Sequence, residues 1–115
     1  MKRRILALSL VCVSAFGSQN LEKIARVEGV DGVFIGPADL AAGLGHLGDQ
    51  QHPEVQAAIK NAIARIKSSG KPAGILATDE ASARRYMEWG TVFTAVGLDL
   101  MILARESEKL AVKFK

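Results

Sequence analysis

The chain has 115 residues, a hydrophobic content of 49% and a formal net charge of +3 at pH 7. Its lysines and arginines are spread along the chain and do not cluster with aromatic residues, so we expect no nucleic-acid partner. A single cysteine, Cys12, excludes an internal disulfide framework. The length and the apolar content allow one small domain with a hydrophobic core.

The first 18 residues differ in character from the rest of the chain. A basic start, Met1-Lys2-Arg3-Arg4, precedes an apolar run from Ile5 to Phe16 and the small residues Gly17-Ser18. This arrangement resembles a secretory signal, but the run is too short for a membrane-spanning helix, and we expect no membrane partner. The same residues, roughly Ile5 to Val13, also fit a strand that is buried on both faces. Periodicity does not separate these alternatives, and the strand is favoured because the first expected helix follows directly.

The apolar run Val33-Phe34-Ile35 is predicted to be a strand that is buried on both faces. The turn pair Gly36-Pro37 ends this strand, because proline cannot donate to a sheet ladder. Asp39 therefore follows the carboxyl end of a buried strand, where parallel α/β proteins place their ligands. A carboxylate there is a candidate metal or substrate ligand. On spacing alone, the alternative that Asp39 only caps the short turn from Leu40 to Leu44 is slightly favoured.

Helices and strands alternate along the rest of the chain. The expected elements are a helix from a Ser18 or Asn20 cap to about Val27, a helix from Pro53 to about Gly70, a strand over residues 73–77, a helix from a Thr78 cap to Trp89, a strand over residues 92–96 and a helix from an Asp99 cap to about Phe114. The polar, glycine-rich segment 43–52 is long enough for an active-site loop. Alternating strands and helices joined by short loops predict an α/β fold with a parallel sheet.

The segment Val30-Asp31-Gly32-Val33-Phe34-Ile35-Gly36-Pro37-Ala38-Asp39-Leu40 resembles the signature of the HpcH/HpaI aldolase family. These metal-dependent (class II) pyruvate aldolases include 2-dehydro-3-deoxyglucarate aldolase and 4-hydroxy-2-oxoheptanedioate aldolase. The similarity continues through Gly45-His46-Leu47-Gly48, His52-Pro53-Glu54-Val55-Gln56, Gly74-Ile75-Leu76-Ala77, Ala83-Arg84-Arg85-Tyr86-Met87-Glu88-Trp89-Gly90 and Val96-Gly97-Leu98-Asp99. It covers about residues 19–115 and matches only the C-terminal part of the family.

The resemblance implies the C-terminal half of a (β/α)8 TIM barrel, with four parallel strands that are each followed by a helix. Residues 19–115 would form this half barrel, and residues 1–18 would be either a barrel strand or a signal-like segment. A complete barrel needs about 250 residues, and half of one leaves two edge strands and one sheet face uncovered. We therefore expect a homo-oligomer or association with another half barrel. The last helix is similar to one that family members use in oligomer contacts, and the resemblance implies a cytoplasmic location.

The chemistry that the resemblance implies is retro-aldol cleavage of a 2-keto-3-deoxy sugar acid, or a related 4-hydroxy-2-oxo acid, to pyruvate and an aldehyde. In the family a divalent metal ion, Mg²⁺ or Mn²⁺, holds pyruvate and stabilises its enolate as a Lewis acid. A glutamate and an aspartate at the ends of adjacent strands hold the metal. Asp39 matches the aspartate, and Ala38 lies where a backbone amide contacts the substrate carboxylate. An ungapped comparison puts Val13 at the glutamate, so weak metal binding is expected.

No catalytic residue is assigned to this chain, because the family's catalytic histidine and arginine lie on early strands that this sequence does not contain. His46, in the loop after Asp39, is the histidine with a route to the site, and His52 is interpreted as a capping or surface residue. Arg84 and Arg85 are interpreted as surface or subunit-contact residues, and Tyr86 and Trp89 as packing or interface residues. Two hypotheses therefore follow: an aldolase whose activity requires the first half from another chain, or a catalytically inactive half barrel that is either a truncated product or a structural partner.

Overall fold

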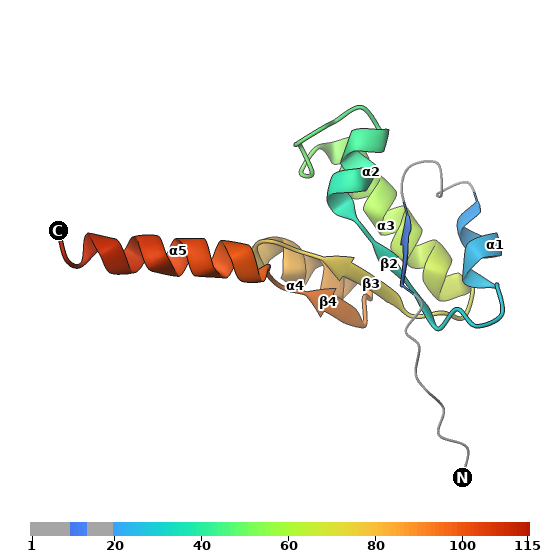
Figure 1. Cartoon of the computed structure of the whole chain (residues 1–115). Helices are drawn as coiled ribbons and strands as arrows, with labels where there is room; N and C mark the ends of the chain where they lie inside the picture. Colours follow the sequence, from blue (N-terminus) through green and yellow to red (C-terminus); the bar gives the residue numbers. More distant parts are fainter. Residues whose placement is uncertain (1–9, 14–19) are drawn as a thin grey trace, which may run out of the picture.

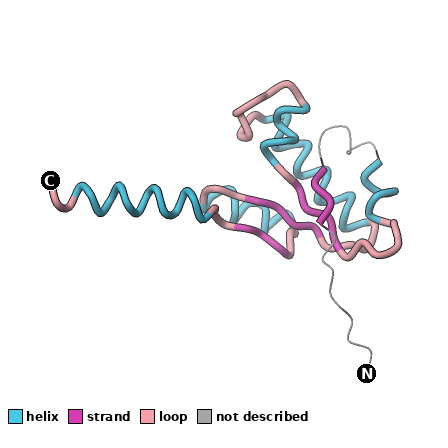
Figure 2. Tube along the Cα trace, viewed as in Figure 1, coloured by secondary structure: helices cyan, strands magenta, loops and turns pink. Residues whose placement is uncertain are grey.

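The computed structural model describes residues 10–13 and 20–115, whose arrangement is drawn in Figure 1. Within these residues four parallel strands form one sheet in the order β1-β2-β3-β4. The strands are β1 (Leu10–Val13), β2 (Gly32–Ile35), β3 (Ala73–Leu76) and β4 (Phe93–Ala95). The helices are α1 (Leu21–Ala25), α2 (Pro37–Gly43), α3 (Pro53–Ser68), α4 (Glu80–Trp89) and α5 (Asp99–Val112). The predicted alternation of strand and helix is confirmed (Figure 2), and the part of the expected first strand before Leu10 lies outside the described residues.

The register of the sheet brings the carboxyl ends of its strands to one edge. Val13 at the end of β1 pairs with Ile35 at the end of β2, and Ile35 pairs with Ile75 of β3. Gly36 and Pro37 follow β2 directly, and Pro37 is the first residue of α2. Proline suits this position because its φ is fixed near the helical value. Residues that follow different strands in the sequence therefore meet along this edge.

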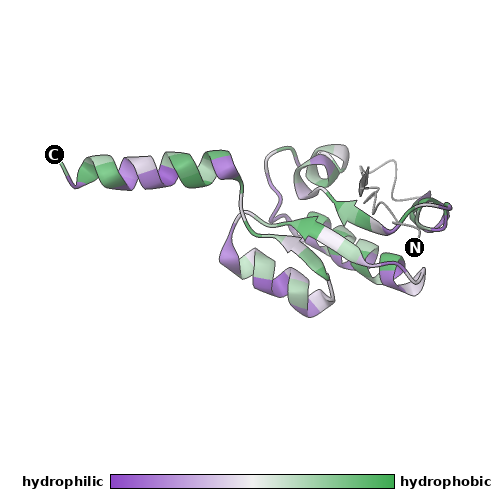
Figure 3. Cartoon of the chain, turned by 60° about the horizontal axis from the view of Figure 1, so that its bottom comes forward, coloured by the Kyte–Doolittle hydropathy of each residue, from purple (hydrophilic) through white to green (hydrophobic). Residues whose placement is uncertain are grey.

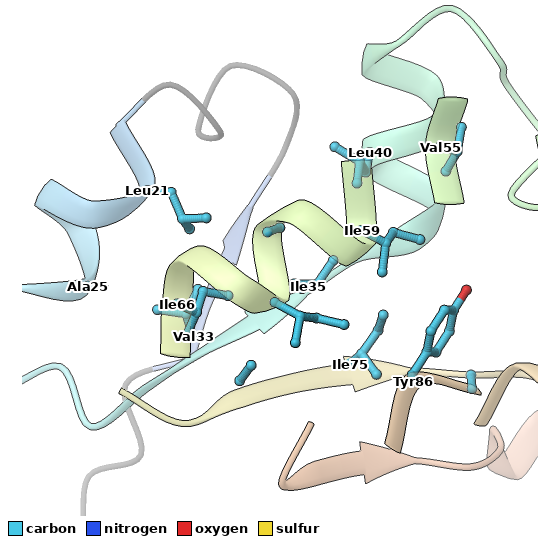
Figure 4. Close-up of a cluster of buried hydrophobic side chains, with 14 of the residues drawn as sticks. Leu21, Ala25, Val33, Ile35, Leu40, Val55, Ile59, Ile66, Ile75 and Tyr86 are labelled. Carbon is cyan, nitrogen blue, oxygen red and sulfur yellow. The ribbon is translucent and has the colours of Figure 1, made fainter. Parts of the chain in front are cut away.

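One face of the sheet packs against α3 and forms the hydrophobic core. Val33 and Ile35 of β2 and Ile75 of β3 are each at most 1% exposed. They pack in one buried cluster with Ile59 and Ile66, which lie two turns apart on α3 (Figure 4). Burial of one such aliphatic side chain stabilises a fold by roughly 1.5–3 kcal/mol. This core fixes α3, and with α3 the loop that precedes it, against the sheet.

The opposite face of the sheet carries aromatic residues and is partly exposed. The rings of Phe34 and Phe93 have centroids 5.8 Å apart, and a Cβ atom on Gly74 between them would lie 2.7 Å from Phe34 Cδ2. Glycine is therefore required at position 74 for the two rings to approach each other. Phe93 is 53% exposed, and an apolar hollow of about 190 Å³ lies between Phe34, Pro72 and Phe93.

The helix α5 extends away from the sheet (Figure 1) and mixes apolar with polar residues along its length (Figure 3). None of its residues is buried, and Leu103 and Leu110 are 68% and 56% exposed. The predicted cap is wrong in position, because Asp99 is the first helical residue and Leu98 precedes it as the N-cap; the Asp99 carboxylate accepts the Leu100 N–H at 2.8 Å. Within the described part of the chain, no helix combines the length and the apolar character of a membrane span.

Two other helices begin at residues that differ from the prediction. The helix α2 begins at Pro37, not at Leu40, because proline is well suited to the first helical position. The N-cap of α4 is Asp79, not Thr78, and its carboxylate accepts the Ser82 N–H at 2.8 Å. This hydrogen bond holds the pKa of Asp79 below its usual range. A carboxylate is a good N-cap, and it also interacts favourably with the positive end of the helix dipole.

Candidate functional site

Ala38 and Asp39 lie in the first turn of α2, directly after the carboxyl end of β2. Gly36 is the N-cap in an extended conformation, with φ −98° and ψ 99°. The Leu40 N–H donates to the Gly36 carbonyl at 3.0 Å and closes the first turn. Leu40 is only 3% exposed and anchors α2 in the core, whereas Ala38 and Asp39 are exposed. The fold therefore presents these two residues to solvent at the edge where the strands end.

The chemistry of this turn suits a small anionic ligand or a cation. The first N–H groups of an α-helix have no acceptor within the helix, so the Ala38 amide at the second helical position can donate to a ligand oxygen. The Asp39 carboxylate, one residue further on, offers hard oxygen atoms of the kind that Mg²⁺ and Mn²⁺ prefer. The structure thus places both predicted site residues together, in an accessible turn. Their roles toward substrate and metal remain predictions.

Among the residues that the structure describes, those at this edge do not contain the complete metal-ligand set that the family resemblance implies. Val13, at the position expected for the second carboxylate, ends β1 and pairs with Ile35. The position therefore lies on the strand next to the one that precedes Asp39, but its residue offers no oxygen ligand from its side chain. Asp79 and Asp99, which follow β3 and β4, accept backbone N–H groups of their own helices. We therefore assign no catalytic step to a metal at this edge.

The loop between α2 and α3 brings His46, His52 and Glu54 together. The two imidazole rings stack with centroids 3.6 Å apart and an interplanar angle of 16°. His46 Nε2 lies 2.7 Å from Glu54 Oε2, and this hydrogen bond lowers the pKa of Glu54. His52 Nδ1 accepts the Glu54 N–H at 3.2 Å, which confirms the predicted helix-cap role of His52. His46 therefore engages Glu54, a contact that no sequence pattern predicted.

The same loop also contacts α4. Arg85 donates to Gln51 Oε1 at 2.8 Å, and Gln51 Nε2 donates to Ser82 Oγ at 3.0 Å. The Arg85 guanidinium lies 5.5 Å from the ring centroid of Tyr86 and 5.8 Å from that of Trp89. The packing roles of Tyr86 and Trp89 are confirmed, but Arg85 is half-buried in these contacts and is not a simple surface residue. Spacing gave no signal for the contact between Arg85 and Gln51, because the two residues are 34 positions apart in the sequence.

Comparison with known sequences identifies relatives of this chain. A profile of the HpcH/HpaI aldolase/citrate lyase family matches residues 6–105. A 5-keto-4-deoxy-D-glucarate aldolase from Escherichia fergusonii is 56% identical over 102 residues, which cover 89% of this chain and 40% of the relative. A hydroxypyruvate/pyruvate aldolase from Pseudomonas aeruginosa is 61% identical over 99 residues, which cover 86% and 37% of the two chains. The chain therefore spans about two-fifths of the length of these curated relatives.

Comparison with solved structures gives the same relationship. An HpcH/HpaI aldolase/citrate lyase family protein from Burkholderia cenocepacia has a TM-score of 0.83 and 43% identity, over 91% of this chain and 41% of that one. An HpcH/HpaI aldolase from Desulfitobacterium hafniense, at 24% identity over 92% of this chain and 42% of that one, has a TM-score of 0.84 and supports the fold alone. The parallel strand–helix units are therefore part of a TIM-barrel fold, as the resemblance implied. Together with the profile match over most of its length, these findings show that the chain belongs to the HpcH/HpaI aldolase/citrate lyase family.

Proposed function

We propose that this chain is the substrate-binding part of an aldolase that cleaves a 2-keto-3-deoxy sugar acid, or a related 4-hydroxy-2-oxo acid, to pyruvate and an aldehyde. The observation that carries the proposal is the place of Asp39, in the first turn of α2 directly after β2. In barrel enzymes the substrate binds at this edge of the strands. The relatives named 5-keto-4-deoxy-D-glucarate aldolase make that compound the first substrate to test.

Within this proposal, Ala38 and Asp39 have different tasks. The Ala38 backbone N–H donates to the substrate carboxylate, and the Asp39 carboxylate ligates a divalent ion, Mg²⁺ or Mn²⁺. Such an ion, when bound, would polarise the keto oxygen of the substrate as a Lewis acid. Because Val13 lacks a carboxylate, the remaining protein ligand must come from outside the residues described here, or the metal binds weakly. No catalytic residue is assigned to this chain.

The uncovered sheet face supports an association with further barrel units, either in the same polypeptide or in another one. Phe93 on this face is 53% exposed, and the hollow beside Phe34 is apolar. The strands β1 and β4 are at the two edges of the sheet and offer backbone groups for further pairing. We propose that the remaining barrel strands cover this face and pair with these edges, so that the substrate site is completed.

The helix α5 supports self-association of the chain. Leu103 and Leu110 are seven residues apart on α5, which places them on one side of the helix, and Phe114 follows in the turn after its end. They are 68%, 56% and 85% exposed. We propose that this stripe packs against a second copy of the chain, as an oligomer contact.

The family resemblance also supports the expected cytoplasmic location.

The test is reconstitution of aldolase activity. The purified chain with Mg²⁺ or Mn²⁺ is assayed for pyruvate release from 5-keto-4-deoxy-D-glucarate, alone and after mixing with the complementary N-terminal part of the Escherichia fergusonii relative. We expect activity in the mixture and little or none in the chain alone. Asp39→Asn is expected to lower the activity of the mixture by about a hundredfold or more, because loss of even a group that only orients a metal ligand costs 10–100-fold.

Asp31→Asn is the matched control, since Asp31 is an exposed aspartate that precedes β2 and so lies at its opposite end. This variant should keep the activity of the mixture. A mixture that forms a stable complex but releases no pyruvate would instead support the catalytically inactive half barrel. Equal activity in the Asp39→Asn and unsubstituted mixtures would contradict the role proposed for Asp39.

A further inference from the structure

The loop that joins α2 to α3 gathers three side chains that are able to ligate a metal. One possible ligand atom from each of His46, His52 and Glu54 lies within 4.8 Å of the other two. Backbone hydrogen bonds hold this arrangement: the His46 N–H donates to the Ala41 carbonyl at 2.8 Å, and the Asp49 N–H donates to the His46 carbonyl at 2.9 Å. The first bond therefore links His46 to α2, and the second forms a turn within the loop after His46.

We propose that His46, His52 and Glu54 form a Zn²⁺ site, here called the loop zinc site. Two imidazole nitrogens and one carboxylate oxygen are a ligand set that suits Zn²⁺, whereas Mg²⁺ and Ca²⁺ prefer oxygen ligands alone. Three protein ligands leave a fourth tetrahedral position for water or for another ligand. Asp39 does not belong to this group, so the loop zinc site does not depend on the proposed aldolase function.

The hydrogen bonds of the cluster identify the nitrogen atoms that can bind the ion. His52 Nδ1 accepts the Glu54 N–H at 3.2 Å, so it carries a lone pair and the ring proton is on Nε2. Because Nδ1 has one lone pair, Zn²⁺ bound at this atom would replace the hydrogen bond from the Glu54 N–H. The Glu54 carboxylate accepts a hydrogen bond from His46 Nε2–H at 2.7 Å, and Zn²⁺ would take the place of that proton, which is released to solvent.

The side chains must rearrange locally to surround an ion. Ligand atoms bound tetrahedrally at about 2.1 Å from Zn²⁺ lie about 3.4 Å from one another. Each of the three residues offers a ligand atom within 4.8 Å of the other two, so these atoms must approach one another by about an ångström. The two imidazole rings must also turn out of their stacked arrangement, so that their lone pairs point to one ion. His46 is 24% exposed and Glu54 is 60% exposed at the side chain, which leaves the group accessible to an ion from solvent.

The test is isothermal titration of the purified chain with ZnCl₂, beside the double variant His46→Gln/His52→Asn. Glutamine keeps a polar side chain beside Glu54, and asparagine is itself a good N-cap, so this variant should retain the fold. We expect one Zn²⁺ per unsubstituted chain and binding that is weaker by at least about tenfold in the double variant, since these are the only two histidines. Far-ultraviolet circular dichroism checks that the variant is folded.

Two further variants distinguish this site from other metal-binding groups. Cys12→Ser and Asp39→Asn should leave the Zn²⁺ affinity unchanged, because the proposed ligands are His46, His52 and Glu54. In NMR spectra of the imidazole nitrogens, Zn²⁺ should shift the His52 Nδ1 and His46 Nε2 resonances together. The proposal is overturned if the chain does not bind Zn²⁺, if the double variant binds it equally well, or if Cys12→Ser abolishes binding.

Discussion

At the scale of single residues, the ion pair between Glu22 and Arg65 shows how a surface charge contributes to the fold. Arg65 Nε lies 2.5 Å from Glu22 Oε1, and a second Arg65 nitrogen donates to Oε2 at 2.6 Å. Arg65 is half-buried, and its ion pair joins α3 to α1. Its guanidinium holds the pKa of Glu22 at about 2, below the usual 4.5.

This pair predicts a specific pH dependence of stability. Because the pKa of Glu22 is lower in the folded chain, the ion pair stabilises the fold above pH 4.5, and this stabilisation is lost as the pH falls toward 2. We predict that Glu22→Gln lowers the free energy of unfolding at pH 7 and reduces its change between pH 7 and pH 3. Urea unfolding at the two pH values measures both effects.

The control for this prediction is Glu28→Gln, which removes an exposed glutamate beyond the end of α1. That variant should keep the pH dependence of the unsubstituted chain. If Glu22→Gln also keeps it unchanged, the two-point ion pair does not control stability in this pH range.

At the scale of elements, the helices and strands could be predicted because their boundaries are local. Gly36-Pro37 ends β2 and starts α2 within two residues, and Gly90, with φ +105°, ends α4 in a left-handed conformation. The errors concern caps, as at Asp79, because neighbouring polar side chains compete for the same N–H groups. The contacts between elements were not predictable. The pair Glu22–Arg65 spans 43 positions and depends on how α1 packs against α3.

The candidate site also has a part that could be predicted from the sequence and a part that could not. Asp39 could be identified as a candidate ligand because it follows an apolar run that ends at a glycine and a proline. The structure confirms that it lies directly after β2. The position of Val13 beside the end of β2 agrees with the expected order of strands. The contact between His46 and Glu54 was missed, because loop 44–52 has no periodicity and its closure depends on backbone hydrogen bonds.

At this scale, we predict that the helix α5 mediates self-association of the chain. We expect Leu103→Asp/Leu110→Asp to reduce self-association, because each leucine contributes roughly 1.5–3 kcal/mol when it is fully buried against a partner. Analytical ultracentrifugation over a range of concentrations should show the unsubstituted chain as an oligomer and the variant as a smaller species. Leu47→Asp, at an 85% exposed position in the loop, is the control and should leave the association unchanged. A monomeric unsubstituted chain would rule out this role of α5.

At the scale of the whole molecule, the described residues cover one face of the sheet and leave the other face partly exposed. The helix α3 covers the face with Val33 and Ile75, whereas Phe34 and Phe93 meet over Gly74 on the other. An exposed apolar surface of this kind marks a site of association. Among the described residues, β1 and β4 are the edge strands of the sheet, and the chain spans about two-fifths of its relatives' length, so these residues form a core but not a closed barrel.

The uncovered face therefore predicts how the chain binds the remaining barrel units. Phe93→Asp places a charge where the complementary part of a relative would bury an aromatic ring, and burial of an unpaired charge is costly. We predict that this substitution weakens the association of the two parts by at least about tenfold, which corresponds to about 1.4 kcal/mol. Val27→Asp is the matched control, since Val27 is 55% exposed and Phe93 is 53% exposed, but Val27 lies after α1 and outside this face. Titration of one purified part with the other, followed by tryptophan fluorescence, gives both affinities. Equal weakening by the two substitutions would mean that the parts do not meet through the face that carries Phe34 and Phe93.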